Sequence, residues 1–224
     1  PLKVHTGTAS AWDDGSPYTA VFNGTVNVDT GASITSYGGG YSITFNNNVI
    51  NYGTITSGGG STVNFLGTNV TNNGIINPSI LNFLTGNHSL QGTGFVGTNL
   101  NVVSGSTVTL ASNHQLLSVT INTGGTFNLS TFKLSLTASN PIANSGTFNI
   151  TTGAVEYNGT SLQNISTTNI TYNKLRINNS TGTSLPGAVT VNDTLSVILG
   201  DLNLNGFVLT LAASGYLTET DGNT

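Results

Sequence analysis

Apolar and polar residues alternate along short stretches of this chain, and in the clearest stretch the alternation slips by one position. The apolar positions there are Phe127, Leu129, Phe132, Leu134 and Leu136. Successive side chains of a strand face opposite sides, so the second apolar set would be exposed unless the backbone turns between Leu129 and Phe132. The pattern therefore predicts a short strand, a corner at Ser130-Thr131 and a second short strand.

The same stretch is an internal repeat. Residues 125–131 (GTFNLST) return as residues 146–152 (GTFNITT), and a longer copy at residues 200–211 matches residues 125–136. In that copy the corner is Asn205-Gly206, a dipeptide that adopts left-handed backbone conformations at little cost. Self-similarity at about 20 residues is typical of a solenoid, in which each coil buries its apolar face by stacking on its neighbours.

The spacing persists through the chain from Thr25 onward. Phenylalanine recurs at nearly the same interval, at Phe45, Phe65 and Phe83. Corners of the form Asn-x-Gly, which we expect to share one backbone geometry, lie at residues 51–53, 72–74 and 144–146. Coils of about 20 residues stacked at the strand spacing of about 4.8 Å give about ten coils and a rod about 50 Å long. We therefore predict an all-β fold over residues 25–224, a right-handed β-solenoid (parallel β-helix) with about 20 residues per coil and no substantial helix.

Residues 1–24 differ from the rest, because they hold the single tryptophan, Trp12, together with Asp13-Asp14 and Pro17. The ends of a solenoid expose core and unpaired strand edges, which a distinct terminal segment usually covers. We therefore predict that residues 1–24 are an N-terminal cap or attachment segment; the alternative is that they pair with the next subunit of a filament. The sequence up to Thr224 shows no evident polar cap, so we expect the natural chain or its assembly to continue past it.

Composition favours an ordered β protein outside the cell. Of the 224 residues 36% are hydrophobic and only 5% are charged, with a formal net charge of −4. The surface polarity comes from Asn, Thr and Ser, which fits an extracellular structural protein better than a cytosolic one. The chain has no cysteine, hence no disulfide and no thiolate metal site, and no methionine, so we expect a processed chain or a fragment. No apolar run approaches the roughly 20 residues of a membrane-spanning helix.

The few charged residues indicate neither nucleic-acid binding nor catalysis. The basic residues are scattered and predict no patch for a phosphate backbone: Lys3, Lys133, Lys174 and Arg176. Solenoid lyases and hydrolases, the first alternative, need carboxylates grouped on one face with basic neighbours. No two acids recur at one coil spacing with a basic neighbour, and Asp193 and Asp201 are the closest candidates. We therefore predict solvated corner acids, no catalytic residues and no cofactor.

Metal binding is not predicted either. His5, His88 and His114 are far apart in the sequence, without the short spacing of metal ligands. Asp221-Gly222-Asn223 is faintly similar to a calcium loop, but the nonapeptide Gly-Gly-x-Gly-x-Asp pattern that binds calcium between coils is absent. We therefore expect no metal site.

Three further patterns bear on binding and on modification. Thr-x-Thr on a flat solenoid face can order water or ice, but its three examples do not recur on successive coils: residues 54–56, 107–109 and 218–220. Tyrosines that could line a binding face share no coil phase: Tyr18, Tyr41, Tyr52, Tyr157, Tyr172 and Tyr216. N-linked sequons occur at Asn23, Asn69, Asn158 and elsewhere, and many arise by chance in a chain this rich in Asn and Thr.

The last third of the chain carries the most specific motifs. They lie at residues 155–160 (VEYNGT), 163–165 (QNI), 172–180 (YNKLRINNS), 189–192 (VTVN) with Leu195, and 200–211. In these, residues 153–222 resemble the repeat of large secreted surface proteins of Bacteroidota and related bacteria. The resemblance implies a cell-surface or secreted β-solenoid region of a much longer, adhesin-like protein, with no catalytic residues to carry over. The C-terminal sorting domain that such proteins often have is missing here, which leaves the export route open. Asp193-Thr194-Leu195 also resembles the O-glycosylation motif of Bacteroidota.

Together these patterns predict an extracellular structural protein at the cell surface, either the stalk of a surface adhesin or the subunit of a surface filament, without catalysis. As partners we expect end-to-end self-association into a homo-oligomer or filament, or continuation in a longer chain, together with surface glycans, and no nucleic acid and no membrane span. Two alternatives stay open. A carbohydrate-active solenoid enzyme predicts a cleft with clustered acids, whereas a carbohydrate- or ice-binding module predicts one face lined by aromatic residues or Thr.

Overall fold

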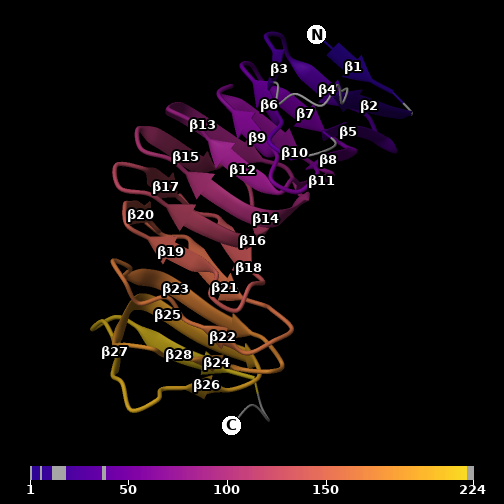
Figure 1. Cartoon of the computed structure of the whole chain (residues 1–224). Coiled ribbons are helices and arrows are strands. Elements are labelled where there is room, and N and C mark those ends of the chain that lie inside the picture. The colour runs from indigo at the N-terminus through magenta and orange to yellow at the C-terminus, as the bar shows by residue number, and fades with distance from the viewer. Residues whose placement is uncertain (1, 6, 12–18, 37–38, 221–224) are drawn as a thin grey trace.

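The computed structural model describes residues 2–5, 7–11, 19–36 and 39–220, and in these residues the chain is an all-β parallel solenoid of about ten turns without a helix (Figure 1). The strand pairings are parallel and join each turn to the next, as Thr62 with Ile80 and Gly7 with Ala32. The predicted β-solenoid with about 20 residues per coil is therefore confirmed, and its right-handed sense stays a prediction. Among the described residues there is no helix long and apolar enough to span a membrane.

One sheet of eight strands forms the first side of the stack. Its strands, in stacking order, are β1 (Leu2–Val4), β4 (Val26–Val28), β7 (Val49–Asn51), β10 (Asn69–Asn72), β13 (Gly86–Gln91), β15 (Ser106–Leu110), β17 (Thr126–Asn128) and β20 (Thr147–Asn149). Phe127 of β17 faces Phe148 of β20 in register, with ring centroids 5.7 Å apart. The internal repeat of residues 125–131 and 146–152 is thus one turn of the solenoid stacked on the next.

The largest sheet has seventeen strands, sixteen of them in two columns. The first column stacks β2 (Gly7–Ala11), β5 (Ala32–Ser36), β8 (Thr54–Ser57), β11 (Ile75–Asn77), β14 (Phe95–Val102), β16 (His114–Ile121), β18 (Lys133–Leu136), β21 (Ala154–Tyr157), β23 (Tyr172–Asn178), β25 (Val189–Leu199) and β28 (Tyr216–Glu219). The second column holds β3 (Thr19–Phe22), β6 (Ser42–Phe45), β9 (Thr62–Phe65), β12 (Ile80–Phe83) and β19 (Ile142–Asn144), together with the second halves of β14 and β16. The long strands β14 and β16 therefore join the two columns.

The last turns depart from this plan. A separate sheet consists of three short strands, β22 (Gln163–Asn164), β24 (Thr183–Ser184) and β26 (Leu202–Asn203). Along the chain, each of them comes after a strand of the first column. The strand β27 (Leu209–Leu211) pairs with the beginning of β25. In Figure 1 these strands form the orange and yellow end of the stack.

An apolar ladder runs without interruption through the first column from β5 to β25. In register from turn to turn, its inward residues are Ile34, Ile55, Ile76, Val96, Leu116, Leu136, Tyr157, Ile177 and Val197. None of the nine side chains is more than 9% exposed. Burial at roughly 25 cal/mol per Å² of apolar area makes this ladder a stabilising part of the core. The stacking of apolar faces predicted for the coils is thus present, with Tyr157 as the one aromatic member of this ladder.

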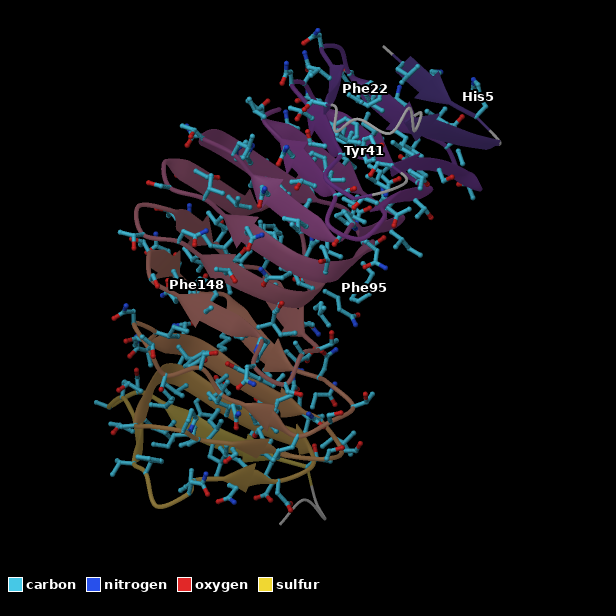
Figure 2. All side chains as sticks on the ribbon, viewed as in Figure 1. His5, Phe22, Tyr41, Phe95 and Phe148 are labelled. Atoms are coloured by element: carbon cyan, nitrogen blue, oxygen red, sulfur yellow. The ribbon has the colours of Figure 1, made fainter. Side chains whose placement is uncertain are left out.

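A second inward row consists of stacked phenylalanines. Phe22, Phe45, Phe65 and Phe83 follow one another in the second column, with centroid separations of 5.2, 5.4 and 5.2 Å. Phe22, labelled in Figure 2, stands at the N-terminal end of this row. Because parallel turns place each ring directly over the last, phenylalanines spaced by one coil in the sequence form a continuous aromatic stack.

The predicted Asn-x-Gly corners are confirmed, but the reason for glycine differs from the expected one. Asn51 Oδ1 accepts a hydrogen bond from Gly53 N at 3.1 Å, and Asn144 Oδ1 accepts one from Gly146 N at the same distance. The φ angles of these glycines are not in the left-handed region. A Cβ at Gly53 would instead lie 2.2 Å from the carbonyl oxygen of Ala32 in the preceding turn. Close approach of two turns, and not a left-handed backbone, therefore requires glycine at these corners.

The strand-corner-strand unit is confirmed in both of its long copies. Residues 125–136 join β17 to β18 with Ser130 at φ 55°, and residues 200–211 join β26 to β27 with Asn205 at φ 53° and Gly206 at φ 77°. The left-handed backbone predicted for Asn205-Gly206 is present. The first copy begins in the eight-stranded sheet and the second in the three-stranded sheet, so the two copies form different corners of the solenoid.

Within residues 1–24, the described parts already belong to the stack. Strands β1, β2 and β3 pair in register with β4, β5 and β6 of the next turn. Trp12, Asp13-Asp14 and Pro17 lie outside the described residues. That this segment caps or attaches the solenoid stays a prediction.

Candidate functional site

A charged groove crosses the outward side of the first column at its C-terminal end. It has a volume of about 390 Å³. Its lining comes from five successive strands, β18, β21, β23, β25 and β28: Lys133, Ala154, Lys174, Arg176, Thr194, Ser196, Tyr216 and Thr218. We call this hollow the charged groove.

Strand register explains why residues of separate turns meet there. One outward row is Lys133, Ala154, Lys174, Thr194 and Tyr216. The parallel row, two positions further along each strand, is Ser135, Glu156, Arg176, Ser196 and Thr218. Alternate residues of a strand share a face, so β23, β25 and β28 each contribute two side chains to the lining, whereas β18 and β21 each contribute one.

Glu156 is the electrostatic centre of the groove. Its side chain is only 3% exposed, and both carboxylate oxygens accept hydrogen bonds. Lys133 Nζ lies 2.6 Å and Ser135 Oγ 2.7 Å from Oε2, and Arg176 Nε donates to Oε1 at 3.1 Å. Burial alone raises the pKa of Glu156, but the hydrogen bonds from Lys133, Ser135 and Arg176 outweigh it and leave the pKa below its usual value. Glu156 is therefore a buried carboxylate that holds two cations in place.

Lys174 is less constrained. Its Nζ lies 3.7 Å from Asp193 Oδ2, and both side chains are partly exposed. Three cations against two carboxylates give the groove and its rim a charge of +1, whereas the whole chain carries −4. The groove can therefore attract an anion on a protein that otherwise repels one.

These contacts overturn two predictions. The basic residues are not scattered, because Lys133, Lys174 and Arg176 line one groove. Nor are all acids solvated corner residues, because Glu156 lies buried in strand β21 and pairs with Lys133 of the preceding turn and Arg176 of the following turn. The sequence pattern that could have revealed this site is the alternation of side chains along the strands. Aligning Ala154-x-Glu156 with Lys174-x-Arg176 places opposite charges on one face. The turns differ in length, since the step from Thr62 to Ile80 is shorter than that from Gly7 to Ala32, and this variation hides the signal from a search at fixed spacing.

Asp193 and Asp201, the closest acid candidates, have different surroundings. Asp193 faces Lys174, whereas Asp201 lines a second, largely apolar hollow at the end of the stack. Thr194 of the O-glycosylation motif is only 8% exposed, and its hydroxyl donates to Asp193 Oδ1 at 2.9 Å. The folded strand therefore hides this hydroxyl from a modifying enzyme.

That second hollow, the terminal hollow, has a volume of about 400 Å³. It is lined by Leu195, Val197, Asp201, Leu202, Leu204, Leu209, Leu211, Leu217 and Glu219. The neighbouring side chains of Phe207 and Val208 are exposed as well. Here the apolar interior of the last turn meets solvent.

The three histidines lie in separate places. His5 pairs with Asp29 at 2.6 Å on the exposed edge labelled in Figure 2. Both ring nitrogens of the buried His88 face carbonyl oxygens, Gly67 O at 2.8 Å and Leu84 O at 2.6 Å. His114 is buried in the core, and burial lowers its pKa. Among the described residues no three His, Cys, Asp or Glu side chains are grouped for a metal ion, and Asp221-Gly222-Asn223 lies outside them.

The patterns considered for flat binding faces do not assemble either. Thr54 and Thr56 stand in register with Ser33 and Thr35 on one side and with Ile75 and Asn77 on the other, so no Thr-x-Thr array forms there. Tyr157 and Tyr172 are buried, whereas Tyr52 and Tyr216 are exposed, which agrees with their lack of a common phase. Of the sequons, Asn23 and Asn69 are exposed and Asn158 is half-buried.

Comparisons of the chain with protein-family models, with curated proteins and with solved structures find no match, so the interpretation of the groove rests on its geometry.

Proposed function

We propose that this chain is an extracellular structural element, the stalk of a surface adhesin or the subunit of a surface filament. The observation that carries the proposal is the uninterrupted apolar ladder from Ile34 to Val197, enclosed by strands that pair from turn to turn. The first column stacks eleven strands, and ten steps of about 4.8 Å give a rod about 50 Å long. Backbone hydrogen bonds run along this rod and join each turn to the next.

Outward side chains reinforce the same axis. Asn64 Nδ2 donates to Thr44 Oγ1 at 3.3 Å, Asn82 Nδ2 to Asn64 Oδ1 at 3.1 Å and Asn101 Nδ2 to Asn82 Oδ1 at 3.1 Å. A second amide ladder joins Thr109, Asn128 and Asn149. Neutral ladders of this kind link turns without relying on salt-sensitive charges, which suits a surface exposed to changing media. They support the extracellular location, as does the resemblance to secreted Bacteroidota repeats.

The terminal hollow supports end-to-end continuation of the stack. Leu209, Leu211 and Leu217 lie on the last turn, and no strand covers the outer edges of β26, β27 and β28 in the described residues. The first turn of a second copy carries the strands β1 and β2 and can add strand to strand on this edge. A further turn of a longer chain would meet the same edge in the same way.

Negative-stain electron microscopy and sedimentation velocity of the purified chain test the proposal. Filaments with a repeat of about 50 Å support the subunit, and single rods of that length support the stalk. The double variant Val208→Lys and Leu217→Lys is expected to abolish end-to-end assembly, because it places charges on the terminal edge. Leu66→Lys, an exposed leucine on the side of the stack, is the matched control. Release of reducing ends from polysaccharides by the wild-type chain would contradict a structural role and favour the enzyme alternative.

A further inference from the structure

Most of the positive charge of this chain is gathered in the charged groove. Three of the four basic residues line it, and the remaining one, Lys3, lies on the first strand at the other end of the stack. A structural ion pair needs one cation for each carboxylate. The groove and its rim hold three cations for Glu156 and Asp193, so one positive charge is available to a ligand.

The cations are oriented with donors to spare. The contact of Arg176 with Glu156 engages Nε, and a guanidinium carries four more N–H donors on its terminal nitrogens. Lys174 lies 3.7 Å from Asp193, beyond good hydrogen-bond distance, and its side chain is 42% exposed. Glu156 fixes Arg176 and Lys133 from below, which lowers the entropy cost of binding an anion above them.

The remaining lining fits the rest of a saccharide. Thr218 presents an exposed hydroxyl on the second row, and this hydroxyl donates a hydrogen bond of 2.8 Å to the buried Ser196 Oγ. Tyr216 closes the first row with its side chain 54% exposed, a ring against which a sugar face can pack. A volume of about 390 Å³ lies within the range of small-ligand sites.

The direction of the groove favours an extended ligand. Lys133 and Lys174 occupy the same row two strands apart, with Ala154 between them. Two strand spacings correspond to about 10 Å along the solenoid axis. An oligosaccharide lying along the axis could place acidic groups near both lysines.

We propose that the charged groove binds a carboxylate-bearing oligosaccharide. Lys174, Arg176 and Lys133 receive its carboxylates, the Thr218 hydroxyl accepts a hydrogen bond from one of its hydroxyl groups, and Tyr216 packs against one ring. This site is independent of whether the rod is a stalk or a filament subunit.

Isothermal titration calorimetry of the whole chain with tetragalacturonate, and with the neutral galactotetraose as matched ligand, tests the proposal. The acidic ligand is expected to bind at least about tenfold more tightly than the neutral one. Lys174→Ala is expected to weaken binding about tenfold or more, and it leaves the Glu156 contacts intact. Tyr216→Ala is expected to weaken it about fivefold. Lys3→Ala removes the same charge outside the groove and is expected to change nothing.

Three results would overturn the site. The first is equal affinity for the acidic and neutral ligands. The second is unchanged affinity in Lys174→Ala with a wild-type unfolding midpoint. The third is displacement of the acidic oligosaccharide by inorganic phosphate at matching concentration, which would mean that the groove holds a simple anion only.

Discussion

The turns from β6 to β12 and the turns from β21 to β25 stack in the same way, but different side chains fill their interiors. In the first region Phe45, Phe65 and Phe83 repeat one side chain at one position of each turn. In the second region the corresponding space is filled by irregular loops around the three-stranded sheet, and polar side chains hold them. The apolar ladder of the first column runs through both regions, but beside it the first region has a periodic column of rings and the second a set of individual contacts.

A closed hydrogen-bond ring in the second region illustrates this. Ser166 N donates to Tyr157 Oη at 2.9 Å, the two phenol oxygens of Tyr157 and Tyr172 lie 2.7 Å apart, and Tyr172 Oη donates to Ser166 O at 2.7 Å. Burial raises the pKa of both tyrosines, so both phenols stay protonated and each oxygen has a defined donor. An irregular turn is thereby fixed without an apolar repeat.

Gln163, the first residue of β22, holds the loop between β21 and β22 in place by hydrogen bonds. Its Oε1 accepts from Gly159 N at 2.8 Å, and its Nε2 donates to the carbonyl oxygens of Leu136 and Ala138, both at 2.9 Å. Asn179 Nδ2 also donates to Gln163 Oε1 at 2.9 Å. The comparison shows that turns of a solenoid can depart from the regular repeat. They do so where buried side-chain amides form hydrogen bonds with backbone groups that no strand pairs.

The largest expected effect is the removal of one ring from the periodic column. Phe65→Ala should lower the free energy of unfolding by about 3–5 kcal/mol, because both neighbouring rings lose contact area and a cavity remains. Urea denaturation followed by circular dichroism measures it. Leu66→Ala, the exposed neighbour, is the control and should change the stability by about 0.5 kcal/mol or less. Equal effects of the two variants would contradict the stacked interior.

The second region should depend on individual polar side chains. Gln163→Leu keeps a similar volume but removes the side-chain partner of Gly159 N and of the Ala138 carbonyl, while the Leu136 carbonyl keeps only its bond from Asn158 N, so we expect a loss of about 2–3 kcal/mol. Gln91→Leu is the matched control, because Gln91 is only partly buried and its side chain contacts Thr71 Oγ1 at 2.7 Å. It should cost under about 1 kcal/mol. A Gln163 variant as stable as the Gln91 variant would show that the irregular turns need no polar support.

The same contrast explains how far the sequence could be interpreted. Where each turn repeats a side chain, as at Phe45 and Phe65 or at Phe127 and Phe148, the spacing alone predicted which residues stack. Asn-x-Gly predicted corners, although not that Gly53 is required by contact with the preceding turn. The Glu156 contacts escaped prediction because nothing in a single sequence states where a shorter or a longer turn occurs. Register decides which charges meet, and register is set by packing across turns.

The smallest expected effect is a dependence of stability on pH. The buried His114 and the groove residue Glu156 should contribute to it in different pH ranges. His114 lies in the core beside Leu134 in register, and burial lowers its pKa below the usual value of about 6.5. The imidazole of the unfolded chain is then protonated at a higher pH than that of the folded chain. The free energy of unfolding should therefore fall as the pH drops below about 6.5, by at most about 1.4 kcal/mol per pH unit. Glu156 has a lowered pKa for the opposite reason, since its carboxylate is stabilised by cations, and its contribution should be lost only as the pH falls below about 4.5.

A single variant separates the two groups. His114→Leu introduces the same side chain as Leu134, which lies in register with it on the next turn. The variant should make the urea midpoint nearly independent of pH between about pH 7 and about pH 5.5, while the decrease below about pH 4.5 remains. Urea denaturation at a series of pH values, with the wild-type chain beside the variant, measures both parts of the curve. If instead the variant kept the full slope in the upper part of this range, the acid sensitivity would not originate in the buried imidazole.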